Sequence, residues 1–341
     1  MAAIFAVSLV VVIAILVLPN MFSISSFLSQ PQSTSTYVVS PANQTGVTAS
    51  PNSTVEIGYP SNYQQLQSYA LAIINENRTS SGLDPVTLSP IPSGQQHADS
   101  MLTNGYFSHW DTQGYKPYMR YSVLSGTGFV EENVAYEFTS LPEYTSTHTI
   151  ERAIGSLEWQ MMNNDSGCCN NGHRDNILTF FHNRVSIGIA YDATHVYFVE
   201  DFETFLTTLN TPISQGNTVN IVGNTSGNIS PTSILIFYDP VPTTVSSSEL
   251  NSNYYGPYGQ GSFLGGVVPP CNGIFSRCLQ FSQGVTEDAS VWQVNGNSID
   301  IQFSLSNFAQ KNGNGVYTVY LVQGTQNNPE FLTSISIFVS S

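Results

Sequence analysis

The sequence predicts an α+β protein with two folded regions that follow an apolar N-terminal segment. Apolar residues recur at helical spacing from about residue 61 to residue 162, and two strand-like stretches close that region near residue 203. Beyond residue 206 the helical pattern stops, and short apolar stretches alternate with Gly, Asn and Pro. We therefore divide the chain into an apolar segment (1–19), a stalk (20–60), a mixed domain (61–205) and a strand-rich module (206–341).

The apolar segment runs from Ala2 to Leu18 and is interrupted only by Ser8. Its length lies between that of a secretory signal core, up to about 15 residues, and that of a membrane span, about 20 residues. A signal peptide and an uncleaved single-pass anchor are both open. The lack of a small-x-small cleavage site directly after Pro19 favours the anchor. Either alternative places the rest of the chain outside the cell, secreted or at the cell surface.

The stalk is rich in Ser, Thr, Pro and Asn and has too few apolar residues to bury a core. Six Asn-X-Ser/Thr triplets across the chain agree with an extracellular, glycosylated protein, although an Asn- and Ser-rich chain also produces such triplets by chance. The candidate glycosylation residues are Asn43, Asn52, Asn77, Asn164, Asn224 and Asn228.

The charge composition excludes one class of partner. The 341 residues include 23 acids and only 8 bases, for a formal net charge of −15, and no basic run occurs. Nothing in the chain can replace the counterions of many phosphates, so we expect no nucleic-acid binding. The scarcity of charge, 9% of residues, also suits an acidic working pH.

Four cysteines are present, and an extracellular location makes disulfides the default. Three connectivities are open. Cys168 can pair with Cys169 and Cys271 with Cys278, or the cysteines can form either of two crossed arrangements that would join the two folded regions. A four-thiolate zinc site is disfavoured because adjacent cysteines do not have the usual CxxC spacing. The disulfide candidates are Cys168, Cys169, Cys271 and Cys278.

The mixed domain begins with a helix after Pro60, for which Ser61 and Gln64 suggest a capping box. Further helices are expected at residues 94–104 and 149–162, and strands at residues 185–191 and 196–203. The module after residue 206 contains five apolar or alternating stretches, which predict an antiparallel, immunoglobulin-like β-sandwich. Residues 239–285 are expected to form a long loop. We expect this module to act as a spacer or binding unit, because it shows no catalytic residue set.

Four blocks of the mixed domain carry a family resemblance. They are IINENRTSSGLDPV, NGYFSHWDTQGYKPYMR, EENVAYE, and GHRDNIL followed by SIGIAYD and YFVEDF. In this order, over about 140 residues, they resemble the CAP superfamily (SCP; cysteine-rich secretory, antigen 5 and pathogenesis-related 1 proteins), especially its prokaryotic branch. The resemblance implies a three-layer α-β-α sandwich for residues 61–205.

The resemblance also implies a cleft in which two histidines and two acidic residues converge. The matching positions here are His109, Glu132 and His173, but Met162 stands where the second acidic residue is expected. Glu158 lies one helical turn before Met162 and either supplies a displaced carboxylate or faces solvent. Trp110 and Tyr136 are expected in the cleft wall as binding residues.

These residues suit more than one function. Two imidazoles, His109 and His173, can hold Zn²⁺, and Glu132 can then act as the base for a metal-bound water. The first hypothesis is nevertheless a binding protein whose cleft holds a small ligand, lipid, metal or peptide without turnover. The alternatives are a metal-assisted, peptidase-like hydrolase and a structural module that contacts cell-surface components.

Overall fold

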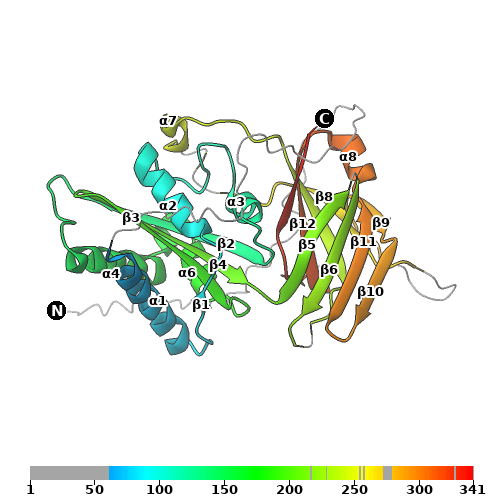
Figure 1. The fold of residues 1–341 in the computed structure, drawn as a ribbon, viewed down its shortest axis with the longest axis horizontal. Helices are drawn as coiled ribbons and strands as arrows, with labels where there is room; N and C mark the ends of the chain where they lie inside the picture. The colour runs from blue at the N-terminus through cyan, green and yellow to red at the C-terminus, as the bar shows by residue number, and fades with distance from the viewer. Residues whose placement is uncertain are drawn as a thin grey trace, which may run out of the picture.

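We analysed a computed structural model of the chain. It describes residues 61–215, 217–227, 229–252, 255, 258–271, 279–325 and 328–340, which form a mixed α+β protein with three β-sheets (Figure 1). The predicted anchor, the stalk and Asn43, Asn52, Asn228 and Cys278 lie outside these residues. No helix of the described part is long and apolar enough to cross a membrane.

The first sheet belongs to the mixed domain. Its strand order is β1-β3-β4-β2, so β2 lies at one edge. β2 and β3 each pair with β4 in antiparallel orientation, and the short β1 pairs with β3 in parallel. The strands are β1 (Thr87–Leu88), β2 (Phe129–Phe138), β3 (Arg184–Tyr191) and β4 (His195–Thr204).

Helices cover both faces of this sheet. Successive residues of β4 point to opposite faces, so they enter different cores. Phe198 and Phe202 pack into a core with helices α1 and α4, whereas Tyr197 and Val199 pack into a second core with α2. The helices of this domain are α1 (Tyr63–Ser80), α2 (Ser93–Asn104), α3 (Pro117–Val123), α4 (Thr147–Asn163), α5 (Ser166–Cys169) and α6 (Gly172–Ile177).

The C-terminal module contains the other two sheets, which share one apolar core. Ile221 and Ile301 reach this core from one sheet, and Ile236 and Val319 reach it from the other. The first of these sheets has the order β10-β11-β6-β5, and the second β13-β12-β7-β8-β9 with β14 beside β12. The strands are β5 (Thr207–Gln215), β6 (Thr218–Thr225), β7 (Ser233–Asp239), β8 (Ser262–Val268), β9 (Val285–Asp288), β10 (Val291–Asn295), β11 (Ser298–Ser304), β12 (Gly315–Thr325), β13 (Asn328–Phe331) and β14 (Ile335–Val339).

Three expectations from the sequence were wrong in detail. Helix α1 is capped by Asn62 rather than Ser61, and no side-chain cap bond is formed, because Asn62 Oδ1 instead accepts from the Tyr191 hydroxyl at 2.9 Å. The module is not wholly antiparallel, since β8 and β9 pair in parallel. Residues 239–285 do not form one loop. They contain α7 (Ser247–Leu250) and β8, a central strand whose apolar residues join the core.

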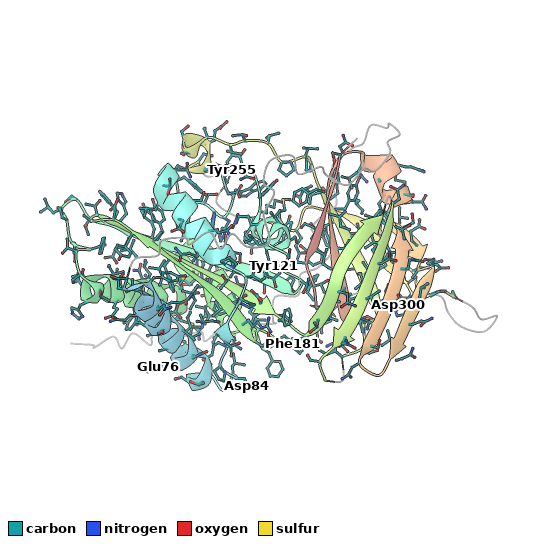
Figure 2. The ribbon with its side chains drawn as sticks, in the orientation of Figure 1. Glu76, Asp84, Tyr121, Phe181, Tyr255 and Asp300 are labelled. Carbon is teal, nitrogen blue, oxygen red and sulfur yellow. The ribbon has the colours of Figure 1, made fainter. Side chains whose placement is uncertain are left out.

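The two parts of the chain meet through a buried polar contact. Lys116 Nζ lies 2.7 Å from Asp239 Oδ1, and the Tyr118 hydroxyl donates to Asp239 Oδ2 at 2.7 Å. Tyr118 belongs to α3, which lies between the two parts, as the labelled Tyr121 of the same helix shows (Figure 2). Ser336 of β14 donates its N–H to Ser122 Oγ of α3 at 2.9 Å. The module is therefore packed against the mixed domain.

We expect Asp239→Ala to lower the free energy of unfolding by about 3–5 kcal/mol, because it leaves the Lys116 ammonium buried without its partner. The matched control is Asp288→Ala, which removes an exposed carboxylate of β9 and is expected to cost less than about 0.5 kcal/mol. Urea unfolding of both variants beside the wild type measures the difference. Equal stability of the two variants would contradict a structural role for the Lys116–Asp239 pair.

Candidate functional site

A cavity of about 1070 Å³ lies along the edge strand β2. Eight consecutive residues of β2, 129–136, contribute to its lining. The end of α4, residues 107–109 after α2, and the region of α5 and α6 add further walls. Residues 258–260 and Tyr320 come from the C-terminal module. The cavity is therefore formed by both parts of the chain.

One wall of the cavity is organised by Glu132. His109 Nδ1 lies 2.9 Å from Glu132 Oε1, and Arg120 Nη2 lies 2.5 Å from Glu132 Oε2. Arg120 also donates through Nη1 to the carbonyl oxygen of His109 at 2.8 Å. The Glu132 backbone N–H donates to the Tyr258 hydroxyl at 3.0 Å, and the Tyr258 ring centroid lies 4.9 Å from that of His109. These contacts hold the imidazole in one orientation.

Burial governs the proton affinities of this cluster. It raises the pKa of Glu132 to about 7, although Arg120 opposes the shift. Burial and then the charge of Arg120 lower the pKa of His109 to about 3, so the imidazole is neutral at pH 7. Both oxygens of Glu132 are engaged and the residue is 2% exposed. To act as the predicted base, Glu132 would first have to become accessible to water, because its side chain has no exposed surface.

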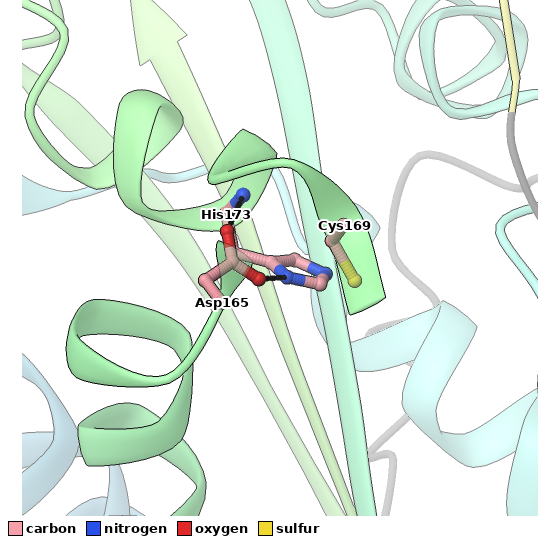
Figure 3. A group of neighbouring side chains, drawn as sticks. All are labelled: Asp165, Cys169 and His173. Atoms are coloured by element: carbon pink, nitrogen blue, oxygen red, sulfur yellow. Dashed lines mark hydrogen bonds and ion pairs between the residues drawn. The ribbon is translucent and has the colours of Figure 1, made fainter. Parts of the chain in front are cut away.

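A second carboxylate–imidazole pair lies in the cavity wall. His173 Nδ1 is 2.6 Å from Asp165 Oδ1, and the His173 backbone N–H donates to Asp165 Oδ2 at 2.9 Å (Figure 3). Asp165 precedes α5, is 3% exposed, and was not among the residues selected from the sequence. Its only signal was its place in the NNDSGCCNNG insert, eight residues before His173.

The structure brings a metal-ligand set together at this second pair. Ligand atoms of Asp165, Cys169 and His173 lie within 4.8 Å of one another (Figure 3). Cys169 is disulfide-bonded, however, and a disulfide sulfur is not a thiolate ligand for Zn²⁺. Over the described residues, His109, Glu132 and His173 do not form such a group. Each imidazole does have its Nδ1 beside a carboxylate, as zinc-bound histidines usually have, so Nε2 is the ligand atom that each offers. Zinc binding stays a prediction.

The three predicted binding residues have different positions. Tyr136 lines the cavity and is 45% exposed. Trp110 does not line it and packs edge-on against Tyr255 at 5.3 Å. Glu158 is 2% exposed, so the expectation that it faces solvent was wrong. Its stripe of α4 packs against α1 and β4, where it hydrogen-bonds Glu200 and accepts from Asn77 Nδ2 at 2.7 Å, away from the cavity.

The modification predictions remain open. Cys169 and Cys271 are not free thiols, but Cys278 and the side chain of Cys168 lie outside the described residues, so the pairing stays a prediction. Asn164 and Asn224 are exposed, as glycosylation would require. The amide nitrogen of Asn77 donates to Glu158, and a glycan there would replace one of its two hydrogens.

Comparison with known proteins adds little. No family model and no curated protein match the sequence. The chain is similar to an extracellular protein containing a SCP domain from Bacillus anthracis str. Ames, with 20% identity over 42% of this chain and 40% of that chain, at a TM-score of 0.29. It is also similar to the CAP domain of Enterococcal PrgA, with 15% identity over 41% of this chain and 60% of that chain, at a TM-score of 0.30. The chain thus spans less than two thirds of either structure, and likenesses at these TM-scores carry no further argument.

The buried carboxyls predict a pH dependence of stability. Burial raises the pKa of five of them, so between about pH 4.5 and 7 the folded chain binds more protons than the unfolded chain and loses stability as pH rises. Burial lowers the pKa of two imidazoles, His97 and His109, which act in the opposite sense below pH 6.5. The five carboxyls belong to Glu132, Glu158, Glu200, Asp201 and Glu203.

Because the raised carboxyls outnumber the lowered imidazoles, we expect a higher Tm at pH 5 than at pH 8. Differential scanning calorimetry between pH 4 and 8 measures this difference. Glu200→Gln removes one of the raised carboxyls and should reduce the slope of Tm against pH, whereas the exposed Asp288→Asn should leave the slope unchanged. A Tm that increases steadily from pH 5 to pH 8 would show that the imidazoles dominate instead.

Proposed function

We propose that this chain is an extracellular binding protein with a CAP-type three-layer domain at residues 61–205 and a β-sandwich at residues 206–341. Its cavity holds an apolar small molecule, lipid or peptide without turnover. The observation that carries the proposal is the cavity itself, whose size and mixed lining are those of ligand sites.

The chemistry of the lining supports an apolar ligand with a few polar groups. Apolar atoms form most of the exposed surface of the wall, and the residues that supply them include Phe107, Val134, Leu157 and Met161. A small number of amides and the two imidazoles provide hydrogen-bonding groups at separate points, which is how a binding site fixes the orientation of a ligand.

Two observations favour binding over hydrolysis. The side chain of Glu132 has no exposed surface and is held by Arg120 and His109 through both oxygens, so a water molecule in the cavity does not reach it. Ser108, a hydroxyl that lines the cavity, donates to the carbonyl oxygen of Tyr255 at 2.6 Å rather than to a histidine. Within the described residues, Ser108 therefore lacks the contact with a base that covalent catalysis needs.

A metal-assisted hydrolase is the second candidate function, and the two carboxylate–imidazole pairs favour it. A neutral imidazole whose Nδ1 is held by a carboxylate presents Nε2 either as a metal ligand or as a base. Zn²⁺ held by His109 and His173 would polarise a substrate carbonyl and activate water.

We expect the intact protein to bind the neutral fluorescent probe N-phenyl-1-naphthylamine with one-to-one stoichiometry. Gln160 is exposed on α4 and lines the cavity, so Gln160→Trp should obstruct it and weaken binding at least tenfold. The matched control is Gln64→Trp, an exposed glutamine of α1 outside the cavity, which should bind as the wild type does. Equal affinities of the two variants, or no binding by the wild type, would contradict the proposal.

Calorimetric titration with Zn²⁺ separates the two candidate functions. Under the binding proposal we expect no tight zinc binding to the oxidised protein. Among the described residues, the group of three possible ligands includes Cys169, which is disulfide-bonded. One-to-one binding that is lost in both His109→Ala and His173→Ala would establish a shared metal site and favour the hydrolase. Binding that is lost only in His173→Ala would locate the metal at Asp165 instead.

A further inference from the structure

The edge strand β2 has main-chain groups that face away from the sheet. Antiparallel strands direct the N–H and C=O of alternate residues to opposite sides. In β2 the main-chain N–H groups of the even-numbered residues point away from β4. Two hydrogen bonds show this: Val130 N–H donates to Ser334 Oγ at 3.3 Å, and Glu132 N–H donates to the Tyr258 hydroxyl at 3.0 Å. The same alternation directs the N–H groups of Val134 and Tyr136 outward.

The first half of this edge is already paired with polypeptide from the C-terminal module. Ser334 donates its N–H to the carbonyl oxygen of Gly128 at 2.9 Å and accepts from the N–H of Val130. Tyr258 then occupies the N–H of Glu132. Within the described residues, the N–H groups of Val134 and Tyr136 have no hydrogen-bond partner, and both residues line the cavity. The second half of the edge therefore opens into the cavity.

The cavity beside this open edge has two side walls. On one side, α4 contributes a single stripe of residues at helical spacing, with Leu157, Gln160, Met161 and Asn164 at i, i+3, i+4 and i+7. On the other side lie Phe107 and His109, from the segment after α2. A groove between a sheet edge and a helix is the geometry in which proteins bind an extended peptide as an added strand.

We propose that the ligand of the cavity is an extended peptide that pairs with β2 at Val134 and Tyr136. This inference rests on the proposed binding function and names its ligand. A lipid would satisfy the apolar walls but would leave both main-chain N–H groups unpaired beside it. A peptide satisfies them with its own carbonyl oxygens, and its alternate side chains face the α4 wall and the Phe107 wall.

The charges around the groove restrict the sequence of the peptide. The lining includes the partly exposed carboxylate of Glu131 but no lysine or arginine, whereas the carboxylates of Glu132 and Asp165 are buried against Arg120 and His173. Acidic side chains in the peptide would be repelled, so the groove favours uncharged or basic segments rich in β-branched residues.

The test uses a rhodamine-labelled hexapeptide, Thr-Val-Thr-Val-Thr-Val, and the same peptide N-methylated at all six residues. Fluorescence anisotropy with the intact protein should show saturable binding of the first peptide and at least tenfold weaker binding of the second, because N-methyl groups at every residue block both edges of an added strand. Hydrogen exchange should slow at the amides of Val134 and Tyr136 when the first peptide is bound.

Two variants at one position isolate the main-chain contact. Tyr136→Ala removes the side chain and keeps the outward N–H, whereas Tyr136→Pro removes both, and proline is tolerated where an edge N–H faces away from the sheet. We expect Tyr136→Pro to bind the peptide at least tenfold more weakly than Tyr136→Ala. If the proline variant does not fold, the N-methylated peptide and the exchange data carry the test with wild-type protein.

The outcomes are distinguishable from a failure of the binding function itself. If N-phenyl-1-naphthylamine binds but the hexapeptide does not at 1 mM, the cavity is a ligand site and strand addition is wrong. Equal binding of the two peptides, or equal binding by the alanine and proline variants, would also overturn the inference. If neither probe binds, the proposed function fails as well.

Discussion

The structure depends most on the burial of one carboxylate, Glu132. A carboxylate that is removed from water must be given hydrogen bonds and an opposite charge, or it is protonated. Here the partners of the carboxylate are Arg120 from α3 and His109 from the segment after α2, and Tyr258 from the C-terminal module accepts from the backbone N–H of the same residue. Meeting the requirements of Glu132 therefore positions three segments at once, and the cavity lies where they meet.

A second polar network connects His173 to the interior of the mixed domain. Asn133 donates through Nδ2 to the carbonyl oxygen of His173 and to Glu200 Oε2, and its own Oδ1 accepts from Asn176. Glu200 in turn hydrogen-bonds Glu158, and burial raises the pKa of both carboxyls. Two neighbouring carboxyls without a nearby base share protons rather than ionise together. This part of the interior therefore consists of carboxyls that share protons and of the amides that hold them.

The sequence predicted the parts that depend on local pattern. The apolar spacing of α1, α2 and α4 and the alternation of β3 and β4 follow from residues within one element, so their positions could be predicted to within a few residues. Asp165 and Tyr258 could not be found in this way, because their contacts depend on how distant segments meet. The burial of Glu158 was missed for the same reason, since its partner Glu200 lies on a strand 42 residues later. The C-terminal module likewise carries no catalytic motif, yet it supplies part of the cavity wall.

The role of that module follows from the edge of β2. A long edge strand with open main-chain groups invites unwanted pairing, and proteins cover such edges with other segments. Ser334 and Tyr258 cover the edge only as far as Glu132. A simple spacer would need neither contact, and a module that served only to protect the sheet would be expected to cover the outward N–H groups of Val134 and Tyr136 as well. Because the covering ends at Glu132, part-way along the cavity, the module shapes one end of the cavity and leaves the edge at Val134 and Tyr136 uncovered, so it contributes to the cavity as well as to stability.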